Sequence, residues 1–130
     1  MTILLTGATG FVGFHLKKRL ELDGHFVIAP IRGQIECCYY DVIINCAAEL
    51  TDESKMYMAN LDLVHYLLLI VKEHGVGKFI QIGSSSEHGI TNHPRCESDL
   101  CHPSNIYEAT KLAATNLCLG YAARYDLDIV

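Results

Sequence analysis

The sequence predicts an α/β fold with a doubly wound parallel sheet. Short, uninterrupted apolar runs alternate with longer segments of helical periodicity, a pattern typical of buried parallel strands joined by helices. The first apolar run leads directly into a glycine-rich turn that opens such a helical segment. The chain has 130 residues, 50% of them hydrophobic, so we treat residues 1–130 as one domain with a proper core.

The first strand and the turn after it are the most informative stretch. The apolar run 3–5 is followed by T-G-A-T-G-F-V-G, whose glycines are Gly7, Gly10 and Gly13. Their spacing permits a sharp turn, close approach of a pyrophosphate to the backbone, and tight packing of helix on strand. The free N–H groups and the positive end of the next helix point at this turn, which suits it to bind phosphate. The alternative is a purely structural glycine turn.

The next segment predicts a helix over 14–22, closed by Gly24, and a second buried strand over 25–29. In dinucleotide-binding domains the end of this strand lies beside the adenosine ribose. An acidic residue there selects NAD, and an arginine accommodates the phosphate of NADP. Arg32 stands at this place and an acidic residue does not. This pattern favours NADP, although Arg32 could equally well be a solvated surface arginine.

The connection to the third strand is unexpectedly short. That strand spans 41–46 and begins nine positions after Arg32, whereas a parallel crossover normally needs a dozen or more residues and usually a helix. Either the connection is abbreviated or a segment is missing from the sequence, and we favour the second explanation. We expect a spatial break or an irregular link between Gly33 and Cys38, which a continuous, well-ordered short loop would contradict.

The middle of the chain predicts a helix and a fourth strand. Residues 51–54 offer capping chemistry, and Asn60 lies near the start of the helix. The apolar positions of this helix recur on one face that must be buried. They are Leu61, Val64, Leu68 and Val71. Gly75 closes the helix before a strand over 78–82.

The last third of the chain predicts a serine turn, a loop and a long helix. Gly83 and three serines follow the fourth strand at its carboxyl end, where doubly wound sheets bind ligands, although clustered serines are usually only turn formers. Residues 89–104 read as a loop, and a helix begins at Tyr107. Its apolar positions are Ala109, Leu112, Ala113, Leu117 and Tyr121. Residues 127–130 look like the start of another strand.

Tyr107 and Lys111 are the candidate chemical pair. They lie four residues apart, so on a helix they share one face and can reach the same ligand. A lysine ammonium near a phenol favours the phenolate and lowers its pKa, as a general acid or base near neutral pH requires. A serine hydroxyl opposite can hydrogen-bond the substrate oxygen. An isolated Y-x-x-x-K pair is more often an ordinary surface pairing, so its interpretation depends on the other motifs.

Taken in order, these motifs resemble the extended short-chain dehydrogenase/reductases, specifically the NAD-dependent epimerase/dehydratase family of nucleotide-sugar enzymes. The matching stretches are T-G-A-T-G-F-V-G, D-V-I-I-N-C-A-A, Asn60, G-V-G-K-F-I-Q-I-G-S-S-S and Y-E-A-T-K-L-A-A. The resemblance covers nearly the whole chain. It implies a Rossmann-type sheet, here abbreviated and without the substrate domain, and NAD or NADP as the cofactor.

The resemblance also implies roles for single residues. The glycine turn holds the pyrophosphate, Ala47 lies along the cofactor, and Asn60 helps to fix the cofactor or nearby backbone. The complete predicted cofactor site is Gly7, Gly10, Phe11, Val12, Gly13, Arg32, Ala47, Asn60 and Lys111.

For catalysis, the resemblance implies that Tyr107 is the acid/base and that Lys111 holds the nicotinamide ribose while tuning Tyr107. Ungapped comparison places the catalytic serine at Ser84, and a one-residue shift would choose Ser85. The helix that carries Tyr107 often helps to form a dimer interface in this family, so a homodimer is a further expectation.

The sequence departs from the family pattern at several points. Residues 87–89 are Glu-His-Gly where the family commonly has valine-tyrosine-glycine, which leaves the substrate side of the pocket open to difference. The Asp-Glu pair of the 4,6-dehydratases falls on Ser85 and Ser86, which favours epimerase or reductase chemistry. The elements usual after the second strand and the C-terminal substrate domain have no counterpart, so residues 1–130 read as a fragment of a longer chain.

Charge and composition argue against several partners. The formal net charge of -5 argues against nucleic acid and anionic membranes. The apolar stretch 61–71 is too short to span a bilayer, and the N-terminus lacks the basic region of a signal peptide, so we expect a cytoplasmic protein. Its six cysteines are expected to be free thiols. The cluster His93, Cys96, Cys101 and His102 fits no standard zinc spacing, so we predict no metal.

Two functional hypotheses follow. In the leading one, the chain is the cofactor domain of a nucleotide-sugar epimerase, dehydratase or ketoreductase, an isomerase or oxidoreductase. Tyr107 exchanges a proton with a sugar hydroxyl as hydride passes to or from the nicotinamide, and Ser84 polarises the oxygen. The alternative is a non-catalytic dinucleotide-binding or regulatory module of the same fold, favoured by the short crossover and by the chain stopping at Val130. The joint presence of Ser84, Tyr107 and Lys111 favours the enzyme.

Overall fold

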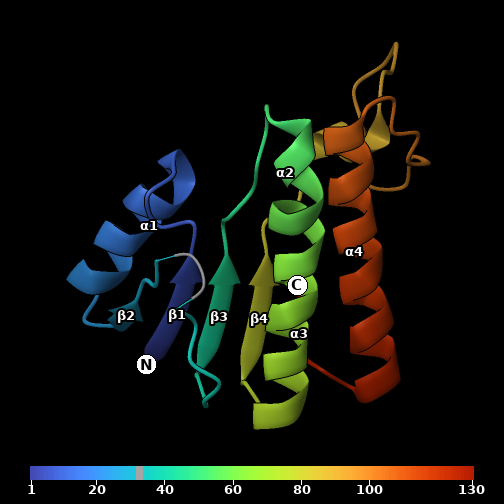
Figure 1. Cartoon of the computed structure of the whole chain (residues 1–130). Helices are drawn as coiled ribbons and strands as arrows, with labels where there is room; N and C mark the ends of the chain where they lie inside the picture. The colour runs from blue at the N-terminus through green and yellow to red at the C-terminus, as the bar shows by residue number, and fades with distance from the viewer. Residues whose placement is uncertain (32–33) are drawn as a thin grey trace.

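The structure, a computed structural model, describes residues 1–31 and 34–130. Within them, parallel strands form one sheet in the order β2-β1-β3-β4 (Figure 1). The strands are β1 (Thr2–Thr6), β2 (Phe26–Ile28), β3 (Val42–Asn45) and β4 (Lys78–Gln81). Each pairing is parallel, which confirms the predicted fold class.

Helices connect β1 to β2 and β3 to β4, and further helices follow β4. They are α1 (Phe11–Leu22), α2 (Glu53–Tyr57), the π-helix η1 (Met58–Asp62), α3 (Leu63–His74), the 3-10 helix η2 (Ser85–His88) and α4 (Ile106–Tyr125). Asp52 caps α2 by accepting a hydrogen bond from the N–H of Ser54 at 3.2 Å, as the capping segment 51–54 predicts. Across the described ranges, every helix is too short or too polar to cross a membrane.

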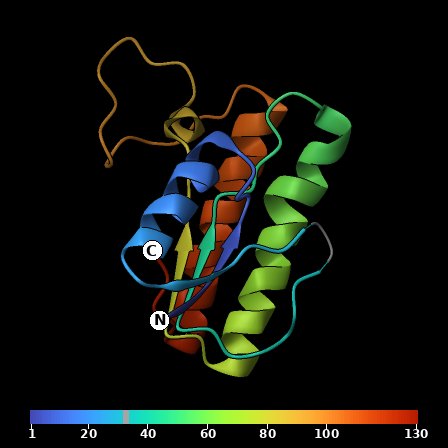
Figure 2. The ribbon, with the colours of Figure 1, turned by 90° about the vertical axis from the view of Figure 1, so that its left-hand side faces the viewer.

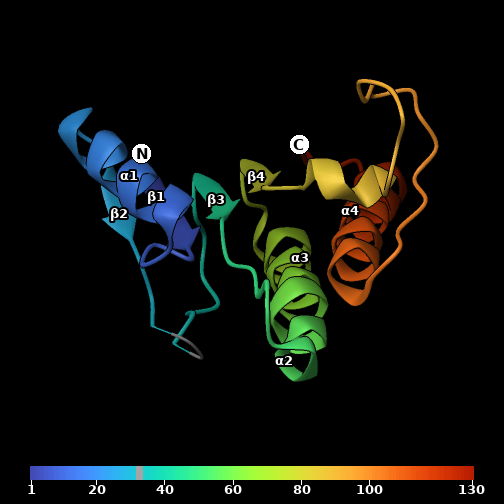
Figure 3. The same cartoon turned by 90° about the horizontal axis from the view of Figure 1, so that it is seen from above.

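The helices lie on both faces of the sheet (Figure 3). On one face, Ile3, Leu5 and Ile44 are buried beneath Leu16 and Leu20 of α1. On the other face, α3 and α4 pack together against the strands. The buried residues there are Leu4, Tyr40, Ile43, Val64, Leu67, Leu68, Ile70, Val71, Val76, Phe79, Ala114 and Cys118. Successive residues of β1 therefore face opposite helical layers, as the two-residue period of a strand requires.

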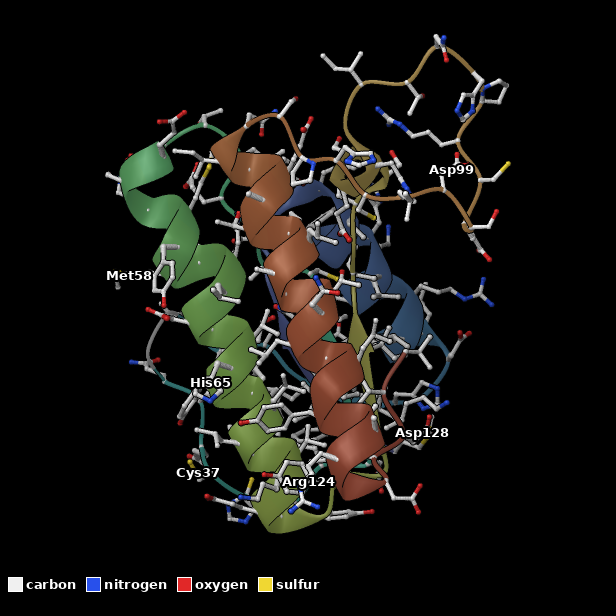
Figure 4. The ribbon with its side chains drawn as sticks, turned by 90° about the vertical axis from the view of Figure 1, so that its right-hand side faces the viewer. Cys37, Met58, His65, Asp99, Arg124 and Asp128 are labelled. Carbon is white, nitrogen blue, oxygen red and sulfur yellow. The ribbon has the colours of Figure 1, made fainter. Side chains whose placement is uncertain are left out.

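Contacts between α3 and α4 tie the second layer together. Val64, Leu68 and Val71 of α3 are buried as predicted. Figure 4 shows α3 and α4 side by side with His65 labelled on α3, and its Nε2 lies 3.1 Å from the hydroxyl oxygen of Tyr121 on α4. The two helices therefore make polar as well as apolar contacts along their length.

One expectation about burial is wrong. The strand predicted to be buried over 25–29 is an edge strand that pairs with β1, so the side chain of Phe26 stays 69% exposed.

The predicted apolar positions of α4 are not its most buried ones. They are only partly buried, and Ala109 is exposed. The buried residues of α4 are Glu108, Lys111, Ala114 and Cys118. The helix thus turns two charged residues inward, which hydrophobic periodicity alone does not reveal.

The connection from β2 to β3 passes β1 in the sheet order, and its described residues form no helix. Gly33 lies outside the described residues, and residues 34–38 form neither helix nor strand, so this part of the predicted link is irregular rather than broken. The buried Tyr40 donates a hydrogen bond to the carbonyl of Glu36 at 2.9 Å, which anchors the link. A missing segment stays a prediction.

The predicted start of another strand runs beside β4. The N–H of Phe79 donates to the carbonyl of Asp128 at 2.9 Å, and the N–H of Gln81 donates to the carbonyl of Val130 at 2.8 Å. These bonds include a parallel bridge between Phe79 and Ile129. The C-terminal residues thus extend the parallel sheet beyond β4.

Gly13 sets how closely α1 packs on the turn after β1. A Cβ atom added at Gly13 would lie 2.2 Å from the carbonyl oxygen of Gly7 and 2.9 Å from the Cα of Ala8. Both atoms belong to the backbone and cannot rotate away. This contact holds α1 tightly against the turn that follows β1. Gly120, inside α4, has no heavy atom within 4 Å of an added Cβ.

We predict opposite stability effects for the same substitution at these two helical glycines. Gly13→Ala should lower the free energy of unfolding by about 1–3 kcal/mol, because the methyl group overlaps backbone atoms. Gly120→Ala should raise it by about 0.5–1 kcal/mol, because alanine has the better helix propensity and the space is open. Urea unfolding curves measure both changes, and equal effects at the two sites would contradict the packing described.

Candidate functional site

The candidate site lies at the edge of the sheet where the parallel strands end (Figure 1). The glycine turn leaves β1 there, the loop that contains Ala47 leaves β3, and η2 follows β4. The loop over 89–104 stands beyond the same edge (Figure 2). Doubly wound sheets bind their ligands at such an edge because several connections converge on it.

The glycine turn is shaped by a close backbone contact. Gly7 has a φ of +69°, which favours glycine, and an added Cβ would lie 2.5 Å from the backbone N of Ala47. The turn after β1 and the loop after β3 therefore touch through their backbones. Gly10 is the N-cap of α1, and Phe11 and Val12 in its first turn are exposed. The start of α1 is thus accessible to a ligand.

Asn45 joins the ends of three strands. Its Oδ1 accepts hydrogen bonds from the hydroxyl of Thr6 and from the N–H of Ala47, the latter at 3.2 Å. Its Nδ2 donates to the Oε1 of Gln81 at 2.8 Å. Because Asn45 is fully buried, these bonds fix the place of Ala47 next to the glycine turn. Sequence reasoning missed this role, although a polar residue ending an apolar run was the available signal.

Asn60 connects the loop after β3 to α4. Its Oδ1 accepts from the N–H of Glu49 at 2.7 Å, and its Nδ2 donates to the carbonyl of Glu49 and the hydroxyl of Thr110, both at 3.0 Å. The hydroxyl of Thr110 donates in turn to the carbonyl of Tyr107 at 2.9 Å. Asn60 lies in the π-helix η1, a feature frequent at functional sites. It therefore holds nearby backbone close to the predicted acid/base.

Ser84 is held at the start of η2. Its backbone is extended, and its Oγ accepts from the N–H of Ser86 at 3.2 Å. Its own N–H donates to the Oε1 of Glu87 at 2.8 Å, which completes a capping box. Ser85 is exposed, and its Oγ lies 3.5 Å from the Nη1 of Arg95. The two serine candidates thus have different surroundings.

Lys111 brings α4 to the end of β4. Its side chain is buried, and its Nζ donates to the carbonyl of Ile82 at 2.5 Å. Burial lowers the pKa of Lys111, and the charge of Glu87 opposes this effect. Tyr107, one helical turn earlier, is partly exposed. Because Ile82 lies two residues before Ser84, this bond brings the segments of all three predicted catalytic residues together.

The loop over 89–104 borders an open cavity of about 580 Å³ beside η2. Arg95 anchors the loop by donating from Nη2 to the carbonyl of Gly89 at 2.6 Å, and Asp99 lies in the part that projects outward (Figure 4). The Sγ of Cys101 lies 3.7 Å from the Nδ1 of His88. Over residues 1–31 and 34–130, no group of three or more His, Cys, Asp or Glu residues is arranged to hold a metal ion.

A comparison with known protein families identifies the family of this chain. The model of the NAD dependent epimerase/dehydratase family matches residues 35–130, which is more than half of the chain. The chain belongs to this family. The matched range contains Ala47, Asn60, Ser84, Tyr107 and Lys111, and it begins after the glycine turn.

Two curated proteins are similar to this chain in sequence. Protein CapI of Staphylococcus aureus is 25% identical over 171 residues, which cover 98% of this chain and 51% of CapI. The probable UDP-glucuronate 4-epimerase of Rhizobium meliloti (strain 1021) is 48% identical over 44 residues, which cover 34% of this chain and 12% of that protein. The aligned span with CapI exceeds the length of the chain, so CapI has residues without a counterpart here.

Solved structures share the fold. MoeE5 in complex with UDP-glucose and NAD superposes with a TM-score of 0.88 and is 28% identical, over 99% of this chain and 52% of MoeE5. A second MoeE5 structure contains UDP-glucuronic acid and NAD. The chain therefore spans about half the length of the relatives that it matches along its whole length.

The structure thus gathers most of the predicted site at one edge of the sheet. The glycine turn adjoins Ala47, and Asn60, Lys111 and the turn with Ser84 surround the start of α4. Arg32, the remaining predicted cofactor residue, lies outside the described residues.

We predict that Asn60→Ala destabilises the protein much more than Asn116→Ala, which changes an exposed residue of α4. Loss of the Asn60 amide leaves the N–H and carbonyl of Glu49 without this partner, which should lower the free energy of unfolding by about 1–3 kcal/mol. Urea unfolding measures the difference. Equal stability of the two variants would show that the bonds of Asn60 contribute nothing.

Proposed function

We propose that this chain is the cofactor-binding part of an NAD(P)-dependent epimerase acting on a UDP-sugar, with Ser84, Tyr107 and Lys111 as its catalytic residues. The observation that carries the proposal is the bond from the Nζ of Lys111 to the carbonyl of Ile82, because it brings the helix of Tyr107 to the strand end that precedes Ser84. Family membership supports the reaction class. The UDP-glucose and UDP-glucuronic acid bound by MoeE5 support the substrate class.

The residues at the sheet edge fit a dinucleotide. Gly7 allows the turn after β1 to pack its backbone against the loop after β3, and the N-terminus of α1 beside it is exposed. A glycine turn at an exposed helix N-terminus accepts a pyrophosphate through backbone N–H groups and the helix dipole. Ala47, also at this edge, presents only a small side chain to the same space. NAD is the cofactor that MoeE5 holds, and a preference for NADP rests on Arg32 alone.

The chemistry needs a proton and a hydride to leave the sugar together. When bound, the nicotinamide supplies the hydride acceptor and donor. Tyr107 takes the proton of a sugar hydroxyl at its phenolic oxygen and returns it after the sugar has presented its other face. The hydroxyl of Ser84 donates to the same sugar oxygen, and Lys111 lies one turn after Tyr107 on α4.

We predict that the chain binds NADH, as measured by titration with nicotinamide fluorescence. Arg32→Ala should weaken NADPH binding by roughly tenfold, about 1.4 kcal/mol, and leave NADH binding unchanged if Arg32 contacts the additional phosphate. Equal effects on both cofactors would remove the preference for NADP. Failure of the unmodified chain to bind either cofactor would contradict the proposed cofactor site.

We predict that Tyr107→Phe slows the reduction of bound NAD by UDP-glucuronic acid about 10²- to 10⁴-fold, since it removes the proton acceptor. Stopped-flow absorbance at the wavelength of reduced nicotinamide follows this half-reaction. Tyr125→Phe, at the far end of α4, is the matched control and should react at the original rate. An unchanged rate in Tyr107→Phe would contradict its role as the proton acceptor. If the unmodified chain binds NADH but does not reduce NAD, that result would favour the non-catalytic module of the same fold.

A further inference from the structure

Glu87 is a buried acidic residue beside the proposed catalytic serine. Glu87 is only 6% exposed, although η2 lies at the edge of the sheet. Its Oε1 accepts from the N–H of Ser84 at 2.8 Å, and its Oε2 accepts from the hydroxyl of Thr115 at 2.8 Å. One carboxylate therefore links the serine turn to α4.

The α4 side of this link lies next to Lys111. Thr115 follows Lys111 by four residues, so both side chains lie on the same face of the helix. The charge of Glu87 raises the pKa of Lys111 against the larger lowering effect of burial. Cys46 and Cys118 are the other titratable groups that act on Lys111, and both favour its charged form. Glu87 is thus the carboxylate that acts on this buried amine.

A packing role alone does not explain an acid at this position. The buried charged residues of the described chain are Glu87, Glu108 and Lys111. Glu108 accepts from the N–H and hydroxyl of Ser104 just before α4, at 2.6 Å and 2.9 Å, which accounts for its burial locally. Burying a carboxylate is costly unless it is hydrogen-bonded or charge-compensated, and an apolar side chain would fill the same space without that cost. One bond of Glu87 reaches the proposed catalytic serine, and the other reaches α4, the helix that carries Tyr107 and Lys111.

We propose that Glu87 is a positioning residue, which fixes the backbone of Ser84 against α4 and keeps a negative charge beside the ammonium of Lys111. This inference rests on the proposed function, since Ser84 and Lys111 are its proposed catalytic residues. Glu87 does not contact the sugar or the cofactor. It acts by setting where the serine turn lies and which protonation state the lysine holds.

The test is the pKa of Lys111, followed by NMR of ¹³C-labelled lysine in the full 130-residue chain. Glu87→Gln keeps an oxygen for the N–H of Ser84 but removes the charge that favours the ammonium, so the pKa of Lys111 should fall. Glu97→Gln, which changes an exposed loop residue, should leave that pKa unchanged. Thr115→Val keeps the charge and removes one hydrogen bond, so it should move the pKa of Lys111 far less than Glu87→Gln.

A purely structural role for Glu87 predicts a different pattern. Glu87→Gln and Thr115→Val would then both reduce stability while leaving the pKa of Lys111 in place, and this result would overturn the proposal. If Glu87→Gln does not fold, the proposal can be tested on the unmodified chain. The amide signal of Ser84 and the Cε signal of Lys111 should both respond when the Glu87 carboxylate, followed by its carboxyl carbon signal, is protonated, and signals that do not respond would overturn the proposal.

The readout separates this inference from the proposed function. If the pKa of Lys111 depends on Glu87 but the chain binds no NADH, the role of Glu87 stands and the proposed enzymatic function is contradicted. If the chain binds NADH and its half-reaction depends on Tyr107, but the pKa of Lys111 does not depend on Glu87, the proposed function stands and the role of Glu87 is contradicted. In an active chain, Glu87→Gln should also shift the pH profile of the half-reaction in the direction of the shifted pKa, with the control Glu97→Gln unmoved.

Discussion

A buried ammonium bonded to a strand carbonyl holds the proposed site together. Lys111 could leave the core only if α4 rotated or moved away from β4, because its Nζ donates to the carbonyl of Ile82. The same helix carries Tyr107, and the chain that follows Ile82 forms the serine turn. The rotational setting of α4, and with it the relative placement of the proposed acid/base and serine, therefore depends on this contact together with the hydrogen bonds that Thr110, Thr115 and Tyr121 make to other elements. The desolvation cost of Lys111 is partly offset by the carbonyl dipole and by the negative charge of Glu87.

Around this contact, the carboxyl edge of the sheet is built from backbone geometry and amide side chains. Gly7 permits the turn after β1 to touch the Cys46–Ala47 peptide, and Asn45 bonds to the ends of both neighbouring strands. Asn60 likewise links two segments, because it bonds the loop after β3 to α4. The edge is therefore rigid where the cofactor is proposed to lie, and the polar loop over 89–104 stands open beside it.

Periodicity and motif spacing predicted the strands and the long helices, because these depend on local patterns of apolar residues and glycines. They could not predict that α4 turns Glu108 and Lys111 inward, since an apolar pattern carries no signal for a buried charge and the partner of Lys111, Ile82, is far away in the sequence. Neither the π-helix around Asn60 nor the contacts of Glu87 was predicted. Glu87 was visible only as a departure from a family pattern, and its partners Ser84 and Thr115 appear only when η2 packs on α4.

The most direct test of the central claim is to map NAD on the chain by backbone amide NMR. We expect the largest shifts at residues 7–13, at Ala47 and at residues 82–84, because the glycine turn, the loop after β3 and the serine turn share one edge of the sheet. Residues on the outer surface of α3 and α4, such as His65, should not move. Shifts concentrated on that surface, or no shifts at saturating NAD, would contradict a dinucleotide site at the carboxyl edge.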